Sequence, residues 1–393
     1  MTRLSIEMLP AAHGDGLWVE WIQAERTHRV LIDGGPGKTY PALRRRVQQL
    51  PDNDRRIDML TITHVDTDHI DGAVTLLLDD LNVEFGDIWF NGRNHVQNPL
   101  SPVSGSRYLG GVQGQVLSAI LALPRFPWNL AFEGRAIVVD PKRAFPVKQI
   151  GGLTFTILSP RVEQLQKLAV TWDFDITKAL KNMELIPAGE SETDVAKKIR
   201  EGGFELAQKL LASRYPKRIN PPPEWAQPSE DGAYLGDPSN PNGSSIAFLV
   251  EDQSQDLAVL FTGDAHAPVL FKSVLELLMQ RGKPRLRLDA MKLAHHGSKN
   301  NISTNLLAQL DCTTFLVSSD GSAGYNHPDD EAIKMILDDA KTRGMRPALH
   351  FNYLSHRTKQ WALESSGNGD LYDAYFPTQG EGDYGLVVTV GKR

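Results

Sequence analysis

The chain has 393 residues, of which 41% are hydrophobic and 23% are charged, and its formal net charge is −6. This composition is typical of a globular protein with enough apolar material for a large core. The acidic balance excludes general electrostatic attraction to nucleic acid or to an anionic membrane, although local basic patches remain compatible with it.

No run of about 18 uncharged apolar residues occurs, and the first residues lack the apolar segment of a secretion signal. We therefore expect no membrane span and a cytoplasmic protein. The one cysteine, Cys312, excludes an internal disulfide. No cysteine-centred motif surrounds it, so we expect a core thiol and not a nucleophile.

The N-terminal part of the chain is predicted to consist of strands and glycine-containing turns. Strands are expected at 4–8, 17–22 and 29–32, and a helix at 40–50. His13 and Asp15 lie in the first turn, and Asp33 follows the third strand. Each of these three residues either contributes to a site or only shapes its turn, and the sequence leaves both interpretations open.

A dense group of polar residues follows the next predicted strand, at 57–63. Four potential metal ligands lie within six positions, namely His64, Asp66, Asp68 and His69. The apolar run 70–78 after them is predicted to be helical, so the four residues occupy a strand-to-helix turn. Carboxylates crowded in this way cannot all stay charged without a compensating cation. The sequence therefore predicts a divalent-metal site at this turn.

The pattern His-x-Asp-x-Asp-His-x-x-Gly closely resembles the first metal motif of the metallo-β-lactamase fold hydrolases. Most of that family has histidine where this chain has Asp66. The aspartate form resembles the subgroup that includes the hydrolase domain of the ComEC competence channel and related phosphodiesterases. The resemblance implies an α/β fold, a metallo-β-lactamase αββα sandwich in which helices flank two mixed β-sheets. It implies one hydrolase domain over residues 1–393.

The middle of the chain is predicted to add strands and then to leave the family pattern. Strands are expected at 87–90, 137–139 and 153–158. Arg93, Asn94 and His95 begin a loop that faces either substrate or solvent. Residues 160–241 are predicted to form a helical insertion or cap, which either sets the choice of substrate or docks a partner protein. Its expected helices are 162–168, 191–199 and 204–213, followed by a proline-rich run from 221.

The later strands carry the remaining matches to the family. Asp264 ends the strand-like segment 257–264 and matches the carboxylate that bridges two metals in the family; the plainer interpretation is a residue that caps its turn. The histidine that many relatives have at the start of the preceding strand is absent, because Asn242 and its neighbours occupy that place. One of the two metal positions therefore lacks an expected ligand.

A His-His-Gly-Ser phrase ends the next strand and resembles the ComEC-like group, where one histidine completes the metal site and its neighbour, with the serine, faces the substrate. We expect His295 to be the ligand, with His296 and Ser298 facing the substrate, although the sequence does not decide between the histidines. Neighbouring side chains on a strand point to opposite sides, so both histidines can be ligands of one metal only if the strand has ended.

The last predicted elements are a strand at 315–319, a helix at 332–341, and strands at 348–353 and 384–390 that complete the second sheet. His327 precedes Pro328 at the start of the helix. It is either a helix-start residue or, by resemblance to the last ComEC-like motif, a phosphate-binding or proton-donating residue.

The resemblance implies two divalent ions, Zn²⁺ or Mn²⁺. The predicted metal ligands are His64, Asp66, Asp68, His69, Asp264 and His295, with Asp264 shared by both ions. The predicted catalytic residues are Asp68, His296, Ser298 and His327. A metal pair activates water, so hydrolysis needs no protein nucleophile. The oxygen-rich first position favours harder ions such as Mn²⁺ more than a histidine-rich one does.

The expected substrate is a phosphodiester, in nucleic acid or in a smaller molecule, and the expected activity is that of a phosphodiesterase or nuclease. Two basic groups, Arg44–Arg46 and 281–287, either guide a nucleic-acid strand or are solvated charges. One alternative is a hydrolase with the same metal site that acts on a lactone, a β-lactam or a thioester. Another is a non-catalytic metal-binding protein that docks a partner through residues 160–241.

Overall fold

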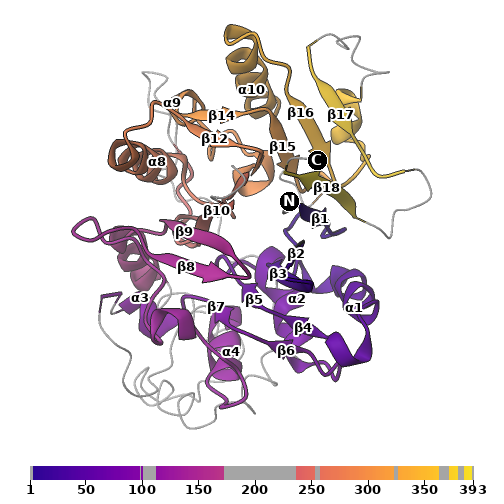
Figure 1. Cartoon of the computed structure of the whole chain (residues 1–393), viewed down its shortest axis with the longest axis vertical. Helices are drawn as coiled ribbons and strands as arrows, with labels where there is room; N and C mark the ends of the chain where they lie inside the picture. The colour runs from indigo at the N-terminus through magenta and orange to yellow at the C-terminus, as the bar shows by residue number, and fades with distance from the viewer. Residues whose placement is uncertain are drawn as a thin grey trace, which may run out of the picture.

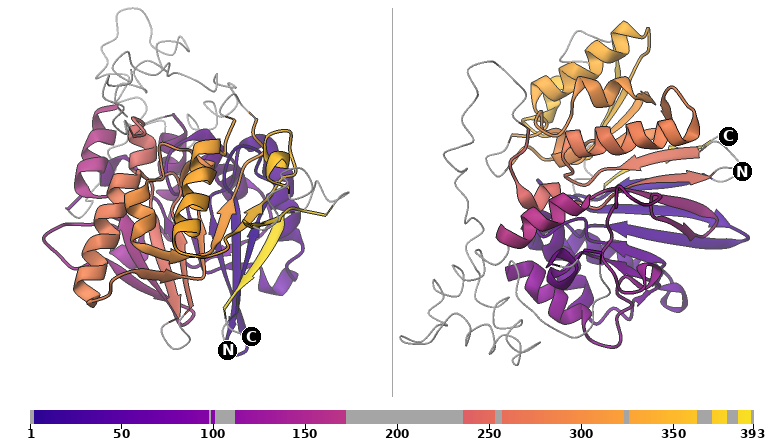
Figure 2. Two further views of the ribbon diagram at one scale, coloured as in Figure 1. Left: turned by 90° about the horizontal axis from the view of Figure 1, so that it is seen from above. Right: turned by 90° about the vertical axis from the view of Figure 1, so that its left-hand side faces the viewer.

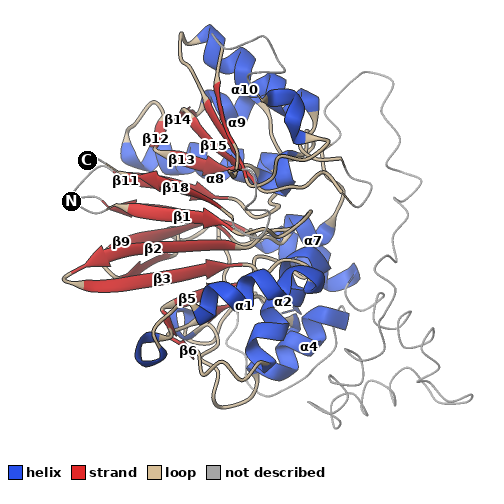
Figure 3. Ribbon diagram, turned by 90° about the vertical axis from the view of Figure 1, so that its right-hand side faces the viewer, coloured by secondary structure: helices blue, strands red, loops and turns tan. Residues whose placement is uncertain are grey.

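The computed structural model describes residues 3–97, 99–100, 112–171, 236–252, 257–322, 326–362, 371–378 and 385–391. Within these residues two large β-sheets are stacked in the middle of the molecule, and helices cover both outer sides (Figure 3). The N-terminal part of the chain forms the lower half in Figure 1 and the C-terminal part forms most of the upper half. The two ends of the chain lie side by side (Figure 2).

The first sheet has six strands in the order β18-β1-β2-β3-β5-β7 within the described part of the chain. Their bounds are β1 Leu4–Met8, β2 Leu17–Gln23, β3 Arg26–Ile32, β5 Met59–Thr61, β7 Ile88–Trp89 and β18 Leu386–Val390. Strands β18 to β3 pair antiparallel, whereas β3, β5 and β7 are parallel.

The second sheet has eight described strands in the order β17-β16-β15-β13-β11-β10-β9-β8. Their bounds are β8 Val147–Ile150, β9 Leu153–Ser159, β10 Ala247–Asp252, β11 Leu257–Phe261, β13 Ala290–Lys292, β15 Thr314–Val317, β16 Ala348–Phe351 and β17 Asp373–Tyr375. Strands β11 to β17 are parallel. Two small pairs add β4 Arg56–Ile57 with β6 Glu84–Phe85, and β12 Leu286–Leu288 with β14 Leu310–Cys312.

Helices cover the outer face of each sheet. Beside the first sheet lie α1 Tyr40–Gln48, α2 Thr67–Leu78, α3 Arg93–Gln97 and α4 Val112–Leu121, and beside the second lie α8 Ala267–Arg281, α9 Thr304–Ala308 and α10 Asp330–Thr342. Short helical turns are η1 Gly37–Thr39, η2 Asp52–Asp54, η3 Leu130–Phe132, α7 Asn240–Gly243, η5 Ala294–Gly297 and η6 Thr358–Trp361. Helix α8 ends at Arg281 and is capped by Gly282, which has a left-handed φ of 59°.

The alternation of side chains along β2 shows why two layers form. Val19 and Trp21 belong to the apolar layer between the sheets, where the ring of Trp21 lies 6.5 Å from that of Phe155. Trp18, which directly precedes Val19 in the strand, belongs to the separate cluster that includes Leu43 of α1. Because successive side chains of a strand point to opposite faces, both faces of this sheet are buried. The resulting αββα layering is compatible with a metallo-β-lactamase-like fold.

Several predicted elements need correction. The C-terminal strand β18 pairs antiparallel with β1 in the first sheet, and not in the second, because strand alternation does not specify which sheet edge a strand joins. The expected strand at 137–139 is only an isolated bridge between Val139 and Arg161. The expected strand at 57–63 is two short strands, β4 and β5, separated at Asp58, whose carboxylate accepts from the backbone N–H of Arg29.

The predicted insertion lies largely outside the described residues. Residues 162–171 are helical, as expected for 162–168, and α7 begins at Asn240. The expected helices at 191–199 and 204–213 and the proline-rich run from 221 fall within 172–235, which the structure does not describe. None of the described helices combines the length and the apolar character that a membrane crossing requires.

Candidate metal centre

The first polar turn has the geometry that its sequence predicts. Strand β5 ends at Thr61 and α2 begins at Thr67, with Asp66 as the N-cap. Asp68 and His69 therefore lie in the first turn of the helix, where the partial positive charge of the helix N-terminus stabilises a carboxylate. A Cβ at Gly72 would collide with the backbone of Gly34, so glycine allows α2 to approach the turn that follows β3.

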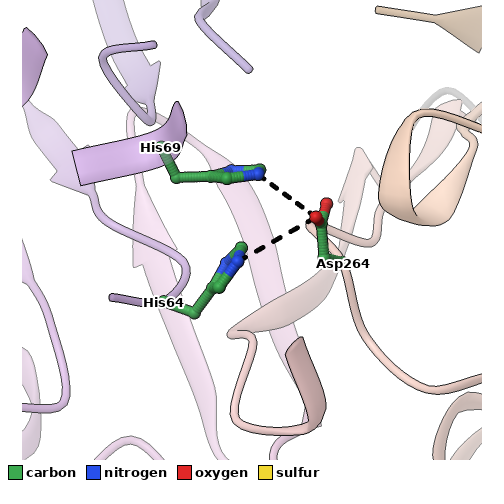
Figure 4. A group of neighbouring side chains, drawn as sticks. All are labelled: His64, His69 and Asp264. Atoms are coloured by element: carbon green, nitrogen blue, oxygen red, sulfur yellow. Dashed lines mark ion pairs between the residues drawn. The ribbon is translucent and has the colours of Figure 1, made fainter. Parts of the chain in front are cut away.

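Asp264 comes from the other sheet, at the end of β11. The preceding Gly263 has a φ of 50°, a conformation that glycine adopts without strain. The Asp264 carboxylate lies opposite the first polar turn: its Oδ2 is 3.2 Å from Nε2 of His69 and 3.9 Å from Nε2 of His64 (Figure 4). Two segments about 200 residues apart in the chain thus meet at one carboxylate.

The two adjacent histidines after β13 also face this carboxylate. Nε2 of His296 lies 3.5 Å from Oδ2 of Asp264 and 3.6 Å from Oδ2 of Asp68. Nε2 of His295 is farther away, 3.9 Å from the same Asp264 oxygen. Four imidazole rings therefore surround Asp264.

The outer nitrogen of each of three rings has a hydrogen-bond acceptor. Nδ1 of His69 lies 2.8 Å from Asp33, and Nδ1 of His296 lies 2.9 Å from the carbonyl oxygen of Ser318. Nδ1 of His64 lies 3.0 Å from the hydroxyl of Thr63, which itself donates to Asp33. Each Nδ1 therefore carries a proton, and each neutral ring has its lone pair on Nε2.

These lone pairs point toward an anion. The Nε2 atoms of His64, His69 and His296 are buried and have no hydrogen-bond partner, and neither does Oδ1 of Asp264. Such an arrangement is stable only if the rings bind protons or share a cation with the carboxylates. The ligand atoms of His64, His69 and Asp264, and those of Asp68, His69 and His296, lie within 4.8 Å of one another. Bonds of about 2.0–2.2 Å to a tetrahedral ion need ligand atoms roughly 3.4 Å apart, so the geometry suits divalent ions.

Without a bound cation, the charges of the cluster shift the pKa values of its own members. Burial lowers the pKa of His69, but Asp264, Asp33 and Asp68 outweigh burial and raise this pKa well above its usual value. The pKa of His296 is raised in the same way, against burial, chiefly by Asp264 and Asp15. Burial raises the pKa of Asp264, but the surrounding imidazoles reverse this effect and hold it well below its usual value.

A fully buried ion pair lies directly behind His296. The ammonium group of Lys292 donates to Oδ2 of Asp15, and both side chains are buried. The other oxygen of Asp15 lies 3.4 Å from Nδ1 of His296. The pKa of Asp15 is lowered although burial alone would raise it, because Lys292 and His296 favour the carboxylate. The turn of Asp15 therefore lies against the histidine cluster.

His295 is held by a second polar network. Its Nδ1 lies 3.1 Å from Oδ1 of Asn301, 3.3 Å from Nδ2 of Asn242 and 3.4 Å from Oδ2 of Asp237. Asp237 accepts from both asparagines, and its pKa is lowered to about 2 because its hydrogen bond and charge interaction with His295 outweigh burial. Asn301 also donates to the backbone oxygen of Asp264.

Other predicted site residues lie around this cluster or apart from it. Asp66 is 3.6 Å from Nε2 of His64, with its side chain 40% exposed. His327 stacks edge-on against His295 with ring centroids 5.0 Å apart, and Ser298 donates its backbone N–H to the His295 carbonyl. His95 is buried in α3 against Trp128, so it is neither a solvated loop residue nor a described member of the cluster.

Sequence reasoning missed Asp237, Asn301 and Lys292. A weak signal existed for Lys292, because it is a cation within the otherwise apolar segment Ala290–Ala294. Asp237 and Asn301 lie in polar surroundings and no pattern marks them. Cys312 is buried, and burial raises the pKa of its thiol to about 12, as a core thiol requires.

The fold and the site thus define a mixed α/β protein with a buried group of histidines and aspartates suited to divalent metals. Among known protein families, none matches the chain. A stretch of 100 residues is 25% identical to ComE operon protein 3 of Bacillus subtilis (strain 168), which is 25% of this chain and 12% of that protein.

Two solved structures of a metallo-β-lactamase with a HARLDQ motif from Cronobacter sakazakii, one of them a mutant, are also similar. They are 11% and 14% identical, cover 54% and 55% of this chain and 96% of their own chains, and give TM-scores of 0.21 and 0.22. Because both TM-scores are low, these two structures do not indicate the function of this chain.

Proposed function

We propose that the protein is a metal-dependent hydrolase that uses a metal-activated water. This proposal rests on one observation. Three buried Nε2 atoms that have no hydrogen-bond partner, those of His64, His69 and His296, all face the carboxylate of Asp264. When bound, a pair of divalent ions acts as a Lewis acid and lowers the pKa of coordinated water toward neutrality.

The donor set fits two ions that share Asp264. Asp68, His69 and His296 would hold one ion, and His64 with Asp66 would hold the other. The mixture of imidazole and carboxylate ligands suits Zn²⁺ and Mn²⁺. Asp33, Thr63 and the Ser318 carbonyl fix the rings so that Nε2 faces inward, which orients the ligands before any ion arrives.

The proposed substrate is a phosphodiester. The His-His-Gly-Ser and Asn-His-Pro phrases, which resemble ComEC-type hydrolases, and the partial match to ComE operon protein 3 support this class. His327 and Ser298 lie beside the paired histidines. Burial lowers the pKa of His327, so its ring is neutral near pH 7. A neutral ring favours a hydrogen-bond contact to phosphate over the role of proton donor.

The basic groups favour a small phosphodiester or a single strand over a duplex. Arg281 pairs with Glu251 through both terminal nitrogens, Arg287 pairs with Asp289, and Arg44 pairs with Asp79. These ion pairs neutralise the cations that duplex binding would use, because affinity for a duplex depends on lysines and arginines that neutralise phosphates.

The test measures hydrolysis of single-stranded DNA, of RNA and of bis(p-nitrophenyl) phosphate with added Mn²⁺ or Zn²⁺. Asp68→Ala is expected to abolish activity, whereas Asp71→Ala, on the same helix but outside the ligand groups, is expected to retain it. Metal-loaded protein that cleaves none of these phosphodiesters contradicts the substrate class. Hydrolysis of a lactone, β-lactam or thioester instead would establish the alternative enzyme.

A further inference from the structure

The paired histidines have an unusual backbone. His295 has φ 48° and ψ 51°, and His296 has φ 56° and ψ 21°. Two consecutive non-glycine residues in the left-handed region are unfavourable, because each Cβ lies too close to the following carbonyl oxygen. Strain of this kind persists where the surrounding structure enforces it, and it concentrates at functional sites.

The strained turn brings both rings to one side. In a continuing strand, adjacent side chains would point to opposite faces. Strand β13 instead ends at Lys292, and the left-handed turn places Nε2 of both histidines within 3.9 Å of Oδ2 of Asp264. The outer nitrogens have different partners: Asn301 and Asp237 for His295, and the Ser318 carbonyl for His296. Both rings thus have Nδ1 fixed and Nε2 directed at the same carboxylate.

This chain lacks the histidine that many relatives have at the start of the strand before 257–264, and this absence gives the second ring a role. Asn242 occupies that place, and its side-chain amide donates to Asp237 and lies 3.3 Å from Nδ1 of His295. The residue at this position therefore supports His295. The His64 position would otherwise have a single imidazole.

We infer that the two adjacent histidines bind different ions of the proposed metal pair. His296 joins Asp68 and His69, and His295 joins His64 and Asp66, with Asp264 common to both. Each ion then has two imidazoles and two carboxylates, a donor set suited to Zn²⁺ or Mn²⁺. The inference rests on the proposed metal-dependent function and adds the ligand that the first position lacks.

The two positions differ in how closely their ligands approach. His64 and His295 are each 3.9 Å from Oδ2 of Asp264, against 3.2 Å for His69 and 3.5 Å for His296. The wider position must contract more when an ion binds. The ion at His64 and His295 is therefore expected to bind more weakly and to leave first during dialysis.

The test measures the number of metal ions per chain in Mn²⁺-loaded protein by elemental mass spectrometry. The parent is expected to hold two ions with an exchange-coupled electron paramagnetic resonance spectrum. His295→Gly and His296→Gly are each expected to hold one ion with an uncoupled spectrum. Glycine removes the ring and tolerates the left-handed backbone, so both variants should fold. His350→Ala, which removes a histidine that stacks on Tyr375, is the control and should retain two ions.

Double variants identify which ion each histidine binds. His64→Ala with His295→Gly should lose no more metal than either single change, because both remove the same ion. His295→Gly with His296→Gly should lose both ions. A parent with one ion, or a His295→Gly variant that keeps two, overturns the inference while leaving metal-dependent hydrolysis intact. A parent with no ion and no hydrolysis overturns the proposed function as well.

Discussion

The candidate metal centre around His69 and the apolar layer around Phe248 both contain fully buried side chains, since His69 and Phe248 are each 0% exposed. Around Phe248 the neighbours are the rings of Trp89, Phe155 and Phe261, at centroid distances of 5.7 to 6.1 Å. Around His69 the neighbours are carboxylates and imidazoles, and inward-facing nitrogens have no hydrogen-bond partner.

The two regions are expected to contribute differently, the apolar layer to stability and the candidate metal centre to function. Burial of aromatic rings is favourable by itself, at about 25 cal/mol per Å² of apolar surface. Burial of carboxylates and imidazoles is unfavourable unless protons or metal ions compensate their charges. Changes in the apolar layer should therefore alter stability and leave metal binding intact, whereas changes at the metal centre should alter metal binding and activity.

The largest effect is expected at Asp264. Asp264→Asn removes the negative charge that both proposed ions share, so the rate of phosphodiester hydrolysis should fall by at least about 10³-fold, corresponding to several kcal/mol of lost stabilisation. Metal content should fall with it. Asp311→Asn, at an exposed aspartate of β14, is the matched control and should change neither quantity. Full activity in Asp264→Asn would contradict the assignment of the centre.

The next effect is expected at the buried ion pair. Lys292→Met leaves the Asp15 carboxylate buried without its cation, which should lower the free energy of unfolding by about 3–5 kcal/mol. Urea unfolding of the metal-free protein measures this change in the free energy of unfolding. Adding Asp15→Leu removes the uncompensated charge and should recover most of the loss. If Lys292→Met is as stable as the parent, the ion pair between Lys292 and Asp15 does not stabilise the fold.

Metal removal should have a pH-dependent effect. The pKa values of His69 and His296 are raised in the folded metal-free protein, so their contribution to stability is present below their unfolded pKa and is lost as pH rises through the folded values. Metal binding strengthens over the same range, because protons no longer compete.

The gap in Tm between Mn²⁺-loaded and EDTA-treated protein should therefore widen as pH rises. At a free metal concentration 100 times the Kd the stabilisation is about 2.7 kcal/mol. Differential scanning calorimetry at several pH values measures the gap. A gap that narrows with rising pH would contradict protons as the substitute for metal.

The smallest effect is expected in the apolar layer. Phe248→Leu replaces a buried ring with a smaller side chain and should lower the free energy of unfolding by roughly 1–2 kcal/mol. Metal content and the Tm gap between loaded and metal-free protein should stay as in the parent. A loss of metal in this variant would show that the apolar layer and the metal centre are coupled, and would contradict their separate roles.

Much of the fold followed from local pattern. Strand β1 has the bounds expected from its residues, and α1 begins at the expected Tyr40, because alternation and helical spacing are properties of neighbouring residues. Sheet membership did not follow: β18 was expected in the second sheet and pairs with β1 in the first. Pairing between the two ends of the chain depends on which sheet edge is left open, and no local pattern records this.

The sequence by itself determined the dense group at His64, Asp66, Asp68 and His69, because a short strand-to-helix turn fixes the directions of nearby side chains. Only the tertiary structure placed Asp264 opposite this turn, and only it joined Lys292 to Asp15 across a separation of 277 residues. It also turned His296 toward Asp68, since the left-handed backbone after β13 is enforced by packing and not by residue type. Local spacing selects the ligands of one turn; the stacking of two sheets decides which turns meet.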